Sequence, residues 1–258
     1  MSPVDVIRHH DAPALAEAVA ARIITTLVER IAAADQAHFC LTGGGIGIAV
    51  LEAVARNHGC SSVDWSRVNI WWGDERYLPE GNAERNETAA RDALLRHVPV
   101  DDRRVHPIVG PWASGSSAER AAEMYAEELA AAARPQDRAG VPSMDILLLG
   151  IGPDAHVASL FPEQPALHEE RSVVAVHGSP KPPPTRVTLT FPALNAARET
   201  WILAAGAAKA GAVRLALSDT AGPFQVPAAG VRGRERTLFL LDEAAAAKLP
   251  AGMSRPGA

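Results

Sequence analysis

The residues best suited to chemistry in this chain are Asp154 and His156, which stand two positions apart in the segment from Gly150 to His156. The segment follows Met144–Leu149, a short apolar run typical of a buried strand in a parallel sheet. In open α/β sheets, ligands bind at the carboxyl ends of strands. A histidine can act as a general base near neutral pH, and a carboxylate beside it can hold its tautomer. We interpret this turn as a candidate catalytic site; a histidine that only fills a hydrogen-bonding position is the alternative.

A second candidate site is the loop Thr42-Gly43-Gly44-Gly45, which leads into a predicted helix ending near Arg56. Consecutive glycines expose backbone N–H groups, and the N-terminus of the following helix adds partial positive charge, so the loop favours an anion. The Thr42 side chain adds a hydroxyl group. The glycine spacing matches neither the dinucleotide-binding fingerprint nor a nucleotide P-loop, which ends in Gly-Lys-Ser/Thr. A flexible turn without a ligand is the alternative interpretation.

Charged residues follow the next predicted strand, in the segment Gly73-Asp74-Glu75-Arg76. The Arg76 guanidinium is a planar fork with a permanent charge, which suits a phosphate or a carboxylate. Asp74 or Glu75 can orient a neighbouring group or hold Arg76 in place. A solvated turn is the alternative, because runs of charge usually face water. Farther along the chain, Asn86 stands before a predicted helix, and we expect it to act as the N-cap.

Two more cations occur in later loops. Lys209 falls in the first turn of a predicted helix, where a positive charge is unfavourable beside the positive end of the helix dipole. That placement makes sense if Lys209 shares a bound anion with the helix N–H groups, although a lysine side chain can also extend to water. Arg186 follows the proline-rich loop Ser179–Pro184 and is a further candidate ligand for the anion.

The elements that must position these loops alternate between strands and helices. The predicted strands are Val4–Arg8, His38–Leu41, Val68–Trp72, Val105–Ile108, Met144–Leu149, Ser172–Val176, Arg186–Thr190, Thr200–Ala204 and Thr237–Leu241. The predicted helices are Ala14–Ala33, the segment that follows Gly47, Glu87–Arg96, Ser116–Ala133 and Ala207–Leu217. This alternation implies parallel βαβ units, and hence an α/β fold with a doubly wound, mainly parallel sheet flanked by helices.

Length and composition restrict the remaining possibilities. The chain has 258 residues, of which 47% are hydrophobic, and we expect a single domain over residues 1–258 with a disordered tail at 250–258. A net charge of −5 argues against a nucleic-acid binder. Two cysteines, Cys40 and Cys60, cannot build a disulfide framework or a zinc site. We find neither a secretory signal nor an apolar run near the ~20 residues that cross a bilayer, so we expect a cytoplasmic protein without a membrane partner.

Five segments occur together in an order typical of one family. They are Thr42-Gly-Gly-Gly, Trp72-Gly-Asp-Glu-Arg76, Leu149-Gly-Ile-Gly-Pro-Asp-Ala-His-Val-Ala-Ser-Leu-Phe-Pro162, Lys181-Pro-Pro-Pro-Thr-Arg-Val-Thr-Leu-Thr190 and Gly206-Ala-Ala-Lys209. With them the chain closely resembles the 6-phosphogluconolactonase family over nearly its whole length. The resemblance implies a Rossmann-like α/β fold related to the glucosamine-6-phosphate deaminase/isomerase group. It also implies a carboxylic ester hydrolase of the oxidative pentose phosphate pathway, which hydrolyses 6-phospho-D-glucono-1,5-lactone to 6-phospho-D-gluconate without a metal or organic cofactor.

For that reaction the sequence offers candidate catalytic and phosphate-binding residues, whereas the donors to the carbonyl oxygen are left unassigned, with the N–H groups of the glycine loop as candidates. His156 is the candidate general base, which activates a water molecule and later returns a proton to the ring oxygen, while Asp154 holds its imidazole. Asp74 is the third candidate catalytic residue. The candidates for binding the substrate phosphate are Thr42, Gly43, Gly44, Gly45, Arg76, Lys209 and Arg186.

Two segments depart from the family pattern. Ala155 stands where the family has a glycine before the histidine, so a positive φ at this position would carry strain. In the first loop, Gly45 and Ile46 replace two residues with hydroxyl groups. Phosphate contacts in this loop must therefore depend more on backbone N–H groups.

Two alternative functions remain open. In the deaminase/isomerase branch, which acts on an amino sugar phosphate, Asp74 would be the base that moves a proton between adjacent sugar carbons. Arg76 after Asp-Glu opposes that branch, and so does Ser159-Leu-Phe-Pro162 in place of Phe-Asn-Glu-Pro. The other alternative is a non-catalytic sugar-phosphate sensor, which the presence of both Asp154 and His156 disfavours. In each case we expect a monomer that binds a small phosphorylated sugar and no nucleic acid.

Overall fold

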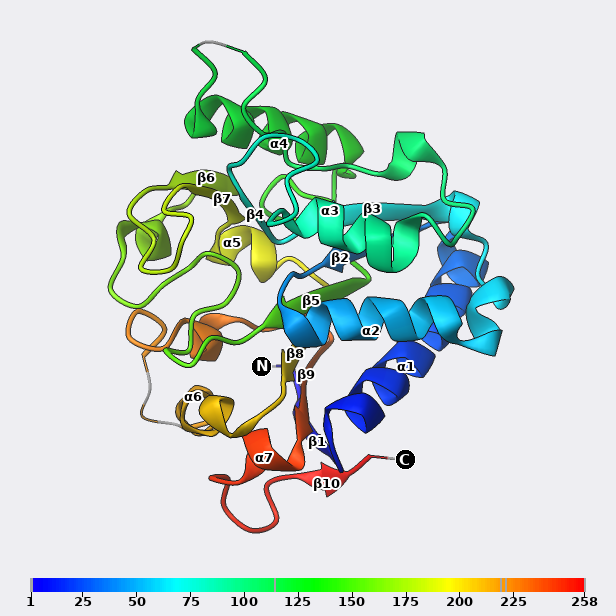
Figure 1. The fold of residues 1–258 in the computed structure, drawn as a ribbon, viewed down its shortest axis with the longest axis vertical. Coiled ribbons are helices and arrows are strands. Elements are labelled where there is room, and N and C mark those ends of the chain that lie inside the picture. The colour runs from blue at the N-terminus through cyan, green and yellow to red at the C-terminus, as the bar shows by residue number, and fades with distance from the viewer. Residues whose placement is uncertain (1, 114, 219, 221, 258) are drawn as a thin grey trace.

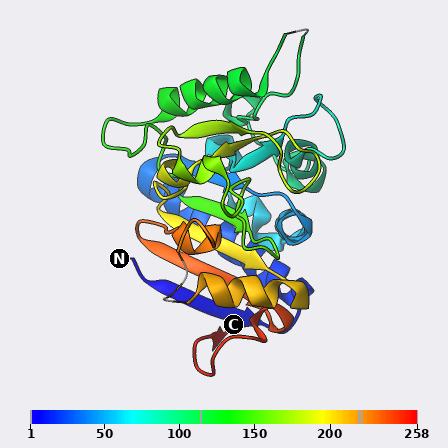
Figure 2. The same cartoon turned by 90° about the vertical axis from the view of Figure 1, so that its left-hand side faces the viewer.

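The computed structural model describes residues 2–113, 115–218, 220 and 222–257, and its strands form two β-sheets (Figures 1 and 2). The main sheet has seven strands, all paired in parallel, in the order β10-β1-β9-β8-β5-β2-β3. They are β1 (Val4–His9), β2 (Ala37–Leu41), β3 (Val68–Trp72), β5 (Ile146–Gly150), β8 (Glu199–Ala204), β9 (Arg236–Asp242) and β10 (Arg255–Pro256). Strands β2 and β3 are buried at every residue, as parallel strands covered on both faces should be. The predicted α/β fold with a mainly parallel sheet is therefore confirmed.

Helices cover the main sheet on both sides. Figures 1 and 2 show α1 (Ala12–Ala34) on one side of the sheet and α6 (Ala210–Ala216) on the other. Helix α1 packs against α2 (Gly45–Arg56). The other α-helices are α3 (Asn86–Ala90), which continues as a π-helical turn over Arg91–Leu95, α4 (Ala118–Ala132), α5 (Phe191–Leu194) and α7 (Glu243–Ala246). Short 3₁₀ turns span His58–Ser62, Trp65–Arg67, Asp102–Arg104, Pro165–His168, Ala207–Lys209 and Pro227–Gly230. None of the helices described is both long enough and apolar enough to cross a membrane.

A second, antiparallel sheet has the strand order β4-β7-β6 and lies with α4 at the β3 end of the molecule (Figure 1). Its strands are β4 (Asp74–Arg76), β7 (Arg186–Leu189) and β6 (Val173–Val176). The sequence predicts β6 and β7 as strands but not their departure from the parallel sheet, and it places β4 in a loop. Gly73 separates β4 from β3, and its carbonyl accepts the Leu189 N–H at 2.9 Å, so the chain leaves one sheet and enters the other within one residue.

Two predictions about strands and termini are wrong. The segment Val105–Ile108 is not a strand: it makes one isolated bridge, between Val105 and Ile70, because Pro107 has no N–H to continue a ladder. The tail that we expected to be disordered instead contains β10, which pairs with β1, and the Gly257 N–H donates to the Arg8 carbonyl at 2.7 Å. Without β10, β1 would present its free backbone groups as an open sheet edge.

One cluster of buried apolar side chains joins the two sheets. It includes Leu15 on α1, Phe39 on β2, Trp201 on β8 and Val187 on β7. Tyr125 of α4 belongs to the same cluster, and its hydroxyl both accepts the Trp72 N–H at 2.9 Å and donates to the Trp72 carbonyl at 3.0 Å. These two bonds hold α4 at the carboxyl end of β3, next to the point where the small sheet begins.

The topology determines where polar loops meet. The chain continues from β2 to β3 on one side and from β5 to β8 and β9 on the other, so the strand order reverses between β2 and β5. Doubly wound sheets bind ligands in the crevice beside such a reversal, at the carboxyl ends of the strands. The loops after the neighbouring strands β8, β5, β2 and β3 carry Lys209, His156, Thr42 and Asp74. The four predicted polar loops therefore meet at one edge of the sheet.

Candidate active site

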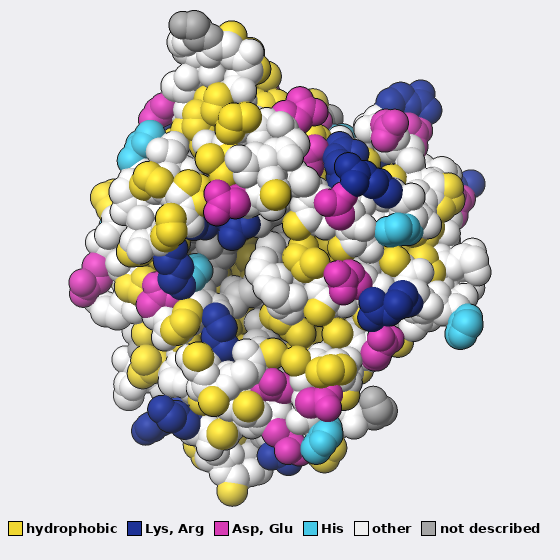
Figure 3. Space-filling view, viewed as in Figure 1, with side chains coloured by type: hydrophobic (Ala, Val, Ile, Leu, Met, Phe, Trp, Pro, Cys, Tyr) yellow, Lys and Arg dark blue, Asp and Glu magenta, His cyan; other side chains and the backbone are white. Residues whose placement is uncertain are grey.

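A cavity of about 490 Å³ opens at this edge, and Figure 3 shows a hollow near the middle of the face, with Lys and Arg side chains and a His beside it. Nine of the ten predicted site residues lie on its wall: Thr42, Gly43, Gly44, Gly45, Asp74, Arg76, His156, Arg186 and Lys209. The tenth, Asp154, lies behind His156 and contacts its ring. Residues that the sequence did not single out as ligands also line the cavity; they include Asn86, Gly150, Gly152 and Lys181.

The turn after β5 holds His156 and Asp154 together. The His156 Nδ1 lies 2.6 Å from Asp154 Oδ1, and the Gly152 N–H donates to the His156 carbonyl at 2.9 Å. Gly152 is required here, because a Cβ at this position would overlap both the His156 ring and the Asp154 carboxylate. Ala155 has a φ of 65°, so the positive φ that the sequence comparison with the family suggested is present.

The surroundings of His156 favour the neutral form of its imidazole. Burial lowers the pKa of His156, and the Lys181 ammonium lowers it further, while the hydrogen bond and the charge of Asp154 raise it in part. For Asp154, burial acts to raise the pKa, but the hydrogen bond with His156 and the positive charges beside it outweigh this and lower the pKa. With Nδ1–H donated to Asp154, the lone pair on Nε2 is free to accept a proton.

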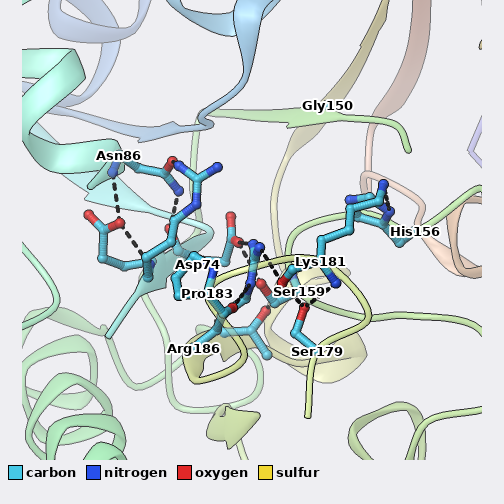
Figure 4. Close-up of polar contacts among 12 residues, drawn as sticks. Asp74, Asn86, Gly150, His156, Ser159, Ser179, Lys181, Pro183 and Arg186 are labelled. Carbon is cyan, nitrogen blue, oxygen red and sulfur yellow. Dashed lines mark hydrogen bonds and ion pairs between the residues drawn. The ribbon is translucent and has the colours of Figure 1, made fainter. Parts of the chain in front are cut away.

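Lys181 is the cation closest to this pair, although the sequence analysis did not name it as a site residue. Its Nζ lies 3.2 Å from His156 Nδ1 and 3.4 Å from Asp154 Oδ1, and Figure 4 shows the side chain extending toward His156. The loop that carries it is held by Arg186, whose Nη2 donates to the carbonyls of Lys181 at 3.1 Å and Pro182 at 3.0 Å. Lys181 belongs to one of the five family-like segments, which was the one available signal.

Asp74 lies on the opposite wall, within a buried polar cluster (Figure 4). Its Oδ2 accepts the Ser159 hydroxyl at 2.7 Å and lies 3.9 Å from Arg186 Nη1. The Ser159 N–H donates to the Thr188 hydroxyl at 3.1 Å, so the turn after β5 and strand β7 together fix this carboxylate. Asp74 is buried, which excludes the solvated-turn alternative for this residue.

Arg76 lines the cavity and is held by the neighbouring segment that leads into α3. Its Nη1 donates to the Glu84 carbonyl at 3.0 Å and to the Asn86 side-chain oxygen. Among the described residues its buried Nε has no hydrogen-bond partner. The predicted N-cap role of Asn86 is wrong: Asn86 is the first residue of α3, after Arg85 at the N-cap, and its amide nitrogen donates to the Asp74 carbonyl at 2.8 Å. The Asn86 side chain is free for this contact because the Glu75 carboxylate accepts the first backbone N–H groups of α3.

The glycine loop forms the wall between Arg76 and the β5 turn. The Thr42 hydroxyl accepts the Gly150 N–H at 3.1 Å and so joins the carboxyl ends of β2 and β5. Gly44 has a φ of 82°, and α2 starts directly after it. The first N–H groups of a helix have no acceptor within the helix, so those at the start of α2 are available to an anion.

Lys209 closes the cavity from the β8 side. Its Nζ donates to the Ile151 carbonyl at 2.7 Å, and burial, together with the charge of Lys181, lowers its pKa. The turn before it depends on Gly206, whose φ is 92° and whose N–H donates to the two Asp242 carboxylate oxygens at 3.0 and 2.8 Å. Asp242 therefore fixes the base of the loop that carries Lys209.

The cavity combines two chemical features: a carboxylate–imidazole pair and several cations. The pair can deprotonate a water molecule, and the cations can bind a phosphate. Within the described part of the chain, no three His, Cys, Asp or Glu side chains are placed to hold a metal ion.

Comparisons with known proteins agree with one another. The family model described as glucosamine-6-phosphate isomerases/6-phosphogluconolactonase matches residues 10–240. The chain is 55% identical over 255 residues to a 6-phosphogluconolactonase of Streptomyces coelicolor, covering 97% of each chain. It is 47% identical over 242 residues to a 6-phosphogluconolactonase of Mycobacterium tuberculosis, covering 93% of this chain and 96% of the relative.

Solved structures give the same result. The structure of 6-phosphogluconolactonase from Trypanosoma brucei matches with a TM-score of 0.85 at 30% identity, over 97% of this chain and 100% of that one. A monomeric glucosamine-6-phosphate deaminase matches with a TM-score of 0.77 at 19% identity, over 95% of this chain and 99% of that one, which shows a shared fold only.

Proposed function

The chain belongs to the glucosamine-6-phosphate isomerase/6-phosphogluconolactonase family, and we propose that the cavity described above hydrolyses 6-phospho-D-glucono-1,5-lactone to 6-phospho-D-gluconate. The reaction is the lactone hydrolysis of the oxidative pentose phosphate pathway. The observation that carries this proposal is the 2.6 Å contact between His156 and Asp154 at one end of a cavity whose other walls carry Arg76 and Lys209.

His156 is the proposed general base. Its Nε2 takes a proton from a water molecule, which attacks the lactone carbonyl, and the resulting imidazolium returns the proton to the ring oxygen when the C–O bond breaks. A positioned base of this kind typically contributes about 10²–10⁴ in rate. Asp154 holds the Nδ1–H tautomer and stabilises the imidazolium. Lys181, with its Nζ 3.2 Å from the His156 ring, is the proposed source of charge relief on the carbonyl oxygen.

The phosphate group occupies the opposite end in this proposal. The Arg76 guanidinium and the N–H groups at the start of α2 are its donors, and Lys209 adds a positive charge from the β8 side. Arg186 has a different part, because its Nε and Nη2 already donate to the carbonyls of the Lys181 loop. Fixing a phosphate that is remote from the reacting bond turns binding energy into orientation of the carbonyl.

The deaminase/isomerase alternative is disfavoured by the contacts of Asp74. That activity would use Asp74 as a mobile base, but its Oδ2 already accepts the Ser159 hydroxyl at 2.7 Å and faces Arg186 at 3.9 Å. We propose instead that the Asp74 carboxylate accepts a hydrogen bond from a hydroxyl group of the sugar. A non-catalytic sensor would not need the His156–Asp154 contact.

The test is lactone-dependent proton release in a weakly buffered solution, corrected for spontaneous hydrolysis, for the wild type and a His156→Ala variant. We expect the enzyme-dependent rate to be lost in the variant, with the fold retained by circular dichroism. Undiminished turnover in His156→Ala would refute the assignment of the base. Ammonia release from glucosamine 6-phosphate by the wild type would instead establish the alternative activity.

We also propose that the chain acts as a single-domain monomer in the cytoplasm, with no nucleic-acid partner. The net charge of −5 supports the last point, because it leaves no excess of basic groups to neutralise a phosphate backbone. Light scattering of the purified protein tests the monomer: a mass near twice 27.2 kDa would contradict it.

A further inference from the structure

Glu75 stands between two cavity residues in the chain but does not itself line the cavity. Successive residues of a strand point to opposite faces, so Asp74 and Arg76 face the cavity while Glu75 points into the protein. Its side chain is 1% exposed, which is unusual for a carboxylate. None of the catalytic steps described above uses it.

The Glu75 carboxylate accepts three backbone N–H groups. Its Oε1 accepts those of Arg76 at 2.8 Å and Asn86 at 2.7 Å, and its Oε2 accepts that of Glu87 at 2.8 Å. Asn86 and Glu87 open α3, whose N-cap residue, Arg85, makes no side-chain capping bond. Glu75 of strand β4 therefore caps the N-terminus of α3. One of its carboxylate oxygens accepts N–H groups from both β4 and α3, and so joins the two elements.

The same two segments are joined again on the cavity side. There the Asn86 side chain accepts from Arg76 Nη1 and donates to the Asp74 carbonyl at 2.8 Å. The guanidinium is thus held through Nη1, and its Nε remains without a partner among the described residues. A shift of α3 relative to β4 would move Asn86 and rotate the Arg76 guanidinium that lines the cavity.

We propose that Glu75 is a positioning residue for the substrate phosphate: by clamping the backbone of Arg76 to that of Asn86, it aims the Arg76 guanidinium into the cavity. The inference rests on the proposed function in one respect, because it takes Arg76 to be a phosphate ligand. It adds a residue that touches neither the substrate nor the reacting atoms.

The cost of burying Glu75 agrees with a role beyond stability. Burial raises the pKa of Glu75 to about 7, although Arg85 and the three N–H groups act to lower it. Arg85 Nη2 lies 3.9 Å from Glu75 Oε2 but 2.8 Å from Glu87 Oε2, so its charge is shared between two carboxylates. A buried ionic cluster of this kind is weak evidence for stability, because desolvation offsets the attraction between its charges.

The experiment compares wild type, Glu75→Gln and a matched control, Asp145→Asn. Asp145 is also a buried carboxylate that accepts a backbone N–H, from His38 at 2.9 Å, but it precedes β5 and so lies at the opposite edge of the sheet. The measurements are kcat, KM, the melting temperature, and the Kd of inorganic phosphate by calorimetry. The Kd needs no catalysis, so it remains informative if the wild type does not hydrolyse the lactone.

We expect Glu75→Gln to raise KM and the phosphate Kd together by about tenfold or more with little change in kcat, since charged hydrogen bonds contribute at this level. Asp145→Asn should lower the melting temperature and leave both constants unchanged. In an Arg76→Lys background the effect of Glu75→Gln should disappear, because coupled residues are not additive. Glu75→Asp, which keeps the charge but is too short to reach the three N–H groups, replaces the Gln variant if that one does not fold.

Three results would overturn the proposal: a lower melting temperature with unchanged KM and Kd, a loss of kcat alone, or an undiminished effect in the Arg76→Lys background. Each leaves the lactonase assignment standing, because wild-type turnover is measured separately. Absent wild-type turnover would overturn the proposed function, and the phosphate Kd would still decide whether Glu75 acts on Arg76.

Discussion

Asp154→Asn should slow the chemical step while leaving substrate binding nearly unchanged. The substitution removes a 2.6 Å hydrogen bond between a carboxylate and His156 Nδ1, and such bonds contribute about 1.5–3 kcal/mol. The Asp154 side chain is 37% exposed, so solvent screening favours the lower half of that range, about 1.5–2 kcal/mol. At 1.36 kcal/mol per tenfold, kcat should fall by about 10–30-fold. An Asn side chain can also donate to Nδ1, which would favour the tautomer whose Nε2 cannot act as a base.

The pH profile makes this prediction sharper. The neutral imidazole is the active form of a base, so kcat/KM should be flat above the pKa of His156 and fall as pH drops through it. Burial sets that pKa below 6.5, Asp154 raises it and Lys181 lowers it. Asp154→Asn should therefore move the acid limb to lower pH, and Lys181→Met should move it to higher pH. Proton-release assays of the wild type and the two variants from pH 5 to 8 measure both shifts. An acid limb that moves to higher pH in Asp154→Asn would refute the proposed interaction between Asp154 and His156.

Three further variants test the surrounding structure. Gly152→Ala should lower kcat by about tenfold or more with a small change in melting temperature, because its Cβ would displace both His156 and Asp154; unchanged kcat would contradict the close approach. Ala155→Gly should raise the melting temperature slightly, since relief of a positive φ worth about 1–2 kcal/mol exceeds the ~0.5–1 kcal/mol entropic cost of glycine; a clear decrease would mean that no strain is present. Burial, and then the charge of Arg134, lowers the pKa of His38 to about 4, so its contribution to stability is present above pH 6.5 and is lost as pH falls toward 4. At pH 5 this loss amounts to about 2 kcal/mol, and urea unfolding of His38→Gln should show a smaller loss between pH 7.5 and 5 than that of the wild type.

The elements that the sequence predicted correctly are those with a strong local signal. Met144–Leu149 could be recognised as a strand because, apart from Asp145, its residues are apolar, as is typical of a parallel strand covered on both faces. The loop after it could be placed at a binding edge, because the alternation of strands and helices fixes which ends of the strands converge. This is why nine of ten candidate residues line one cavity.

What the sequence could not provide depends on contacts between distant segments. Strand β4 consists of Asp-Glu-Arg and has no apolar pattern; it is a strand because it pairs with β7, more than a hundred residues later. The same pairing buries Glu75, whose charge suggested a solvated turn. From the sequence alone, Asn86 looks like an N-cap residue. That it is not depends on Glu75 of β4, whose carboxylate already accepts the first N–H groups of the helix. Lys181 depends on Arg186 for its position, and no local pattern encodes that contact.

The hydrogen-bond partners of the cations in the cavity explain how a protein of net charge −5 can bind a phosphate. On the surface, arginines such as Arg56 and Arg120 pair with carboxylates, which cancels their charge. In the cavity, Lys181 and Arg186 also face carboxylates, but the two cations proposed for the phosphate have neutral partners: Arg76 donates to the Glu84 carbonyl, and Lys209 to the Ile151 carbonyl. A carbonyl oxygen fixes the direction of a cation but leaves its net charge uncompensated. In the low dielectric of a half-buried cavity that charge acts strongly on a dianionic phosphate, so these cations can select a phosphorylated lactone over its neutral counterpart.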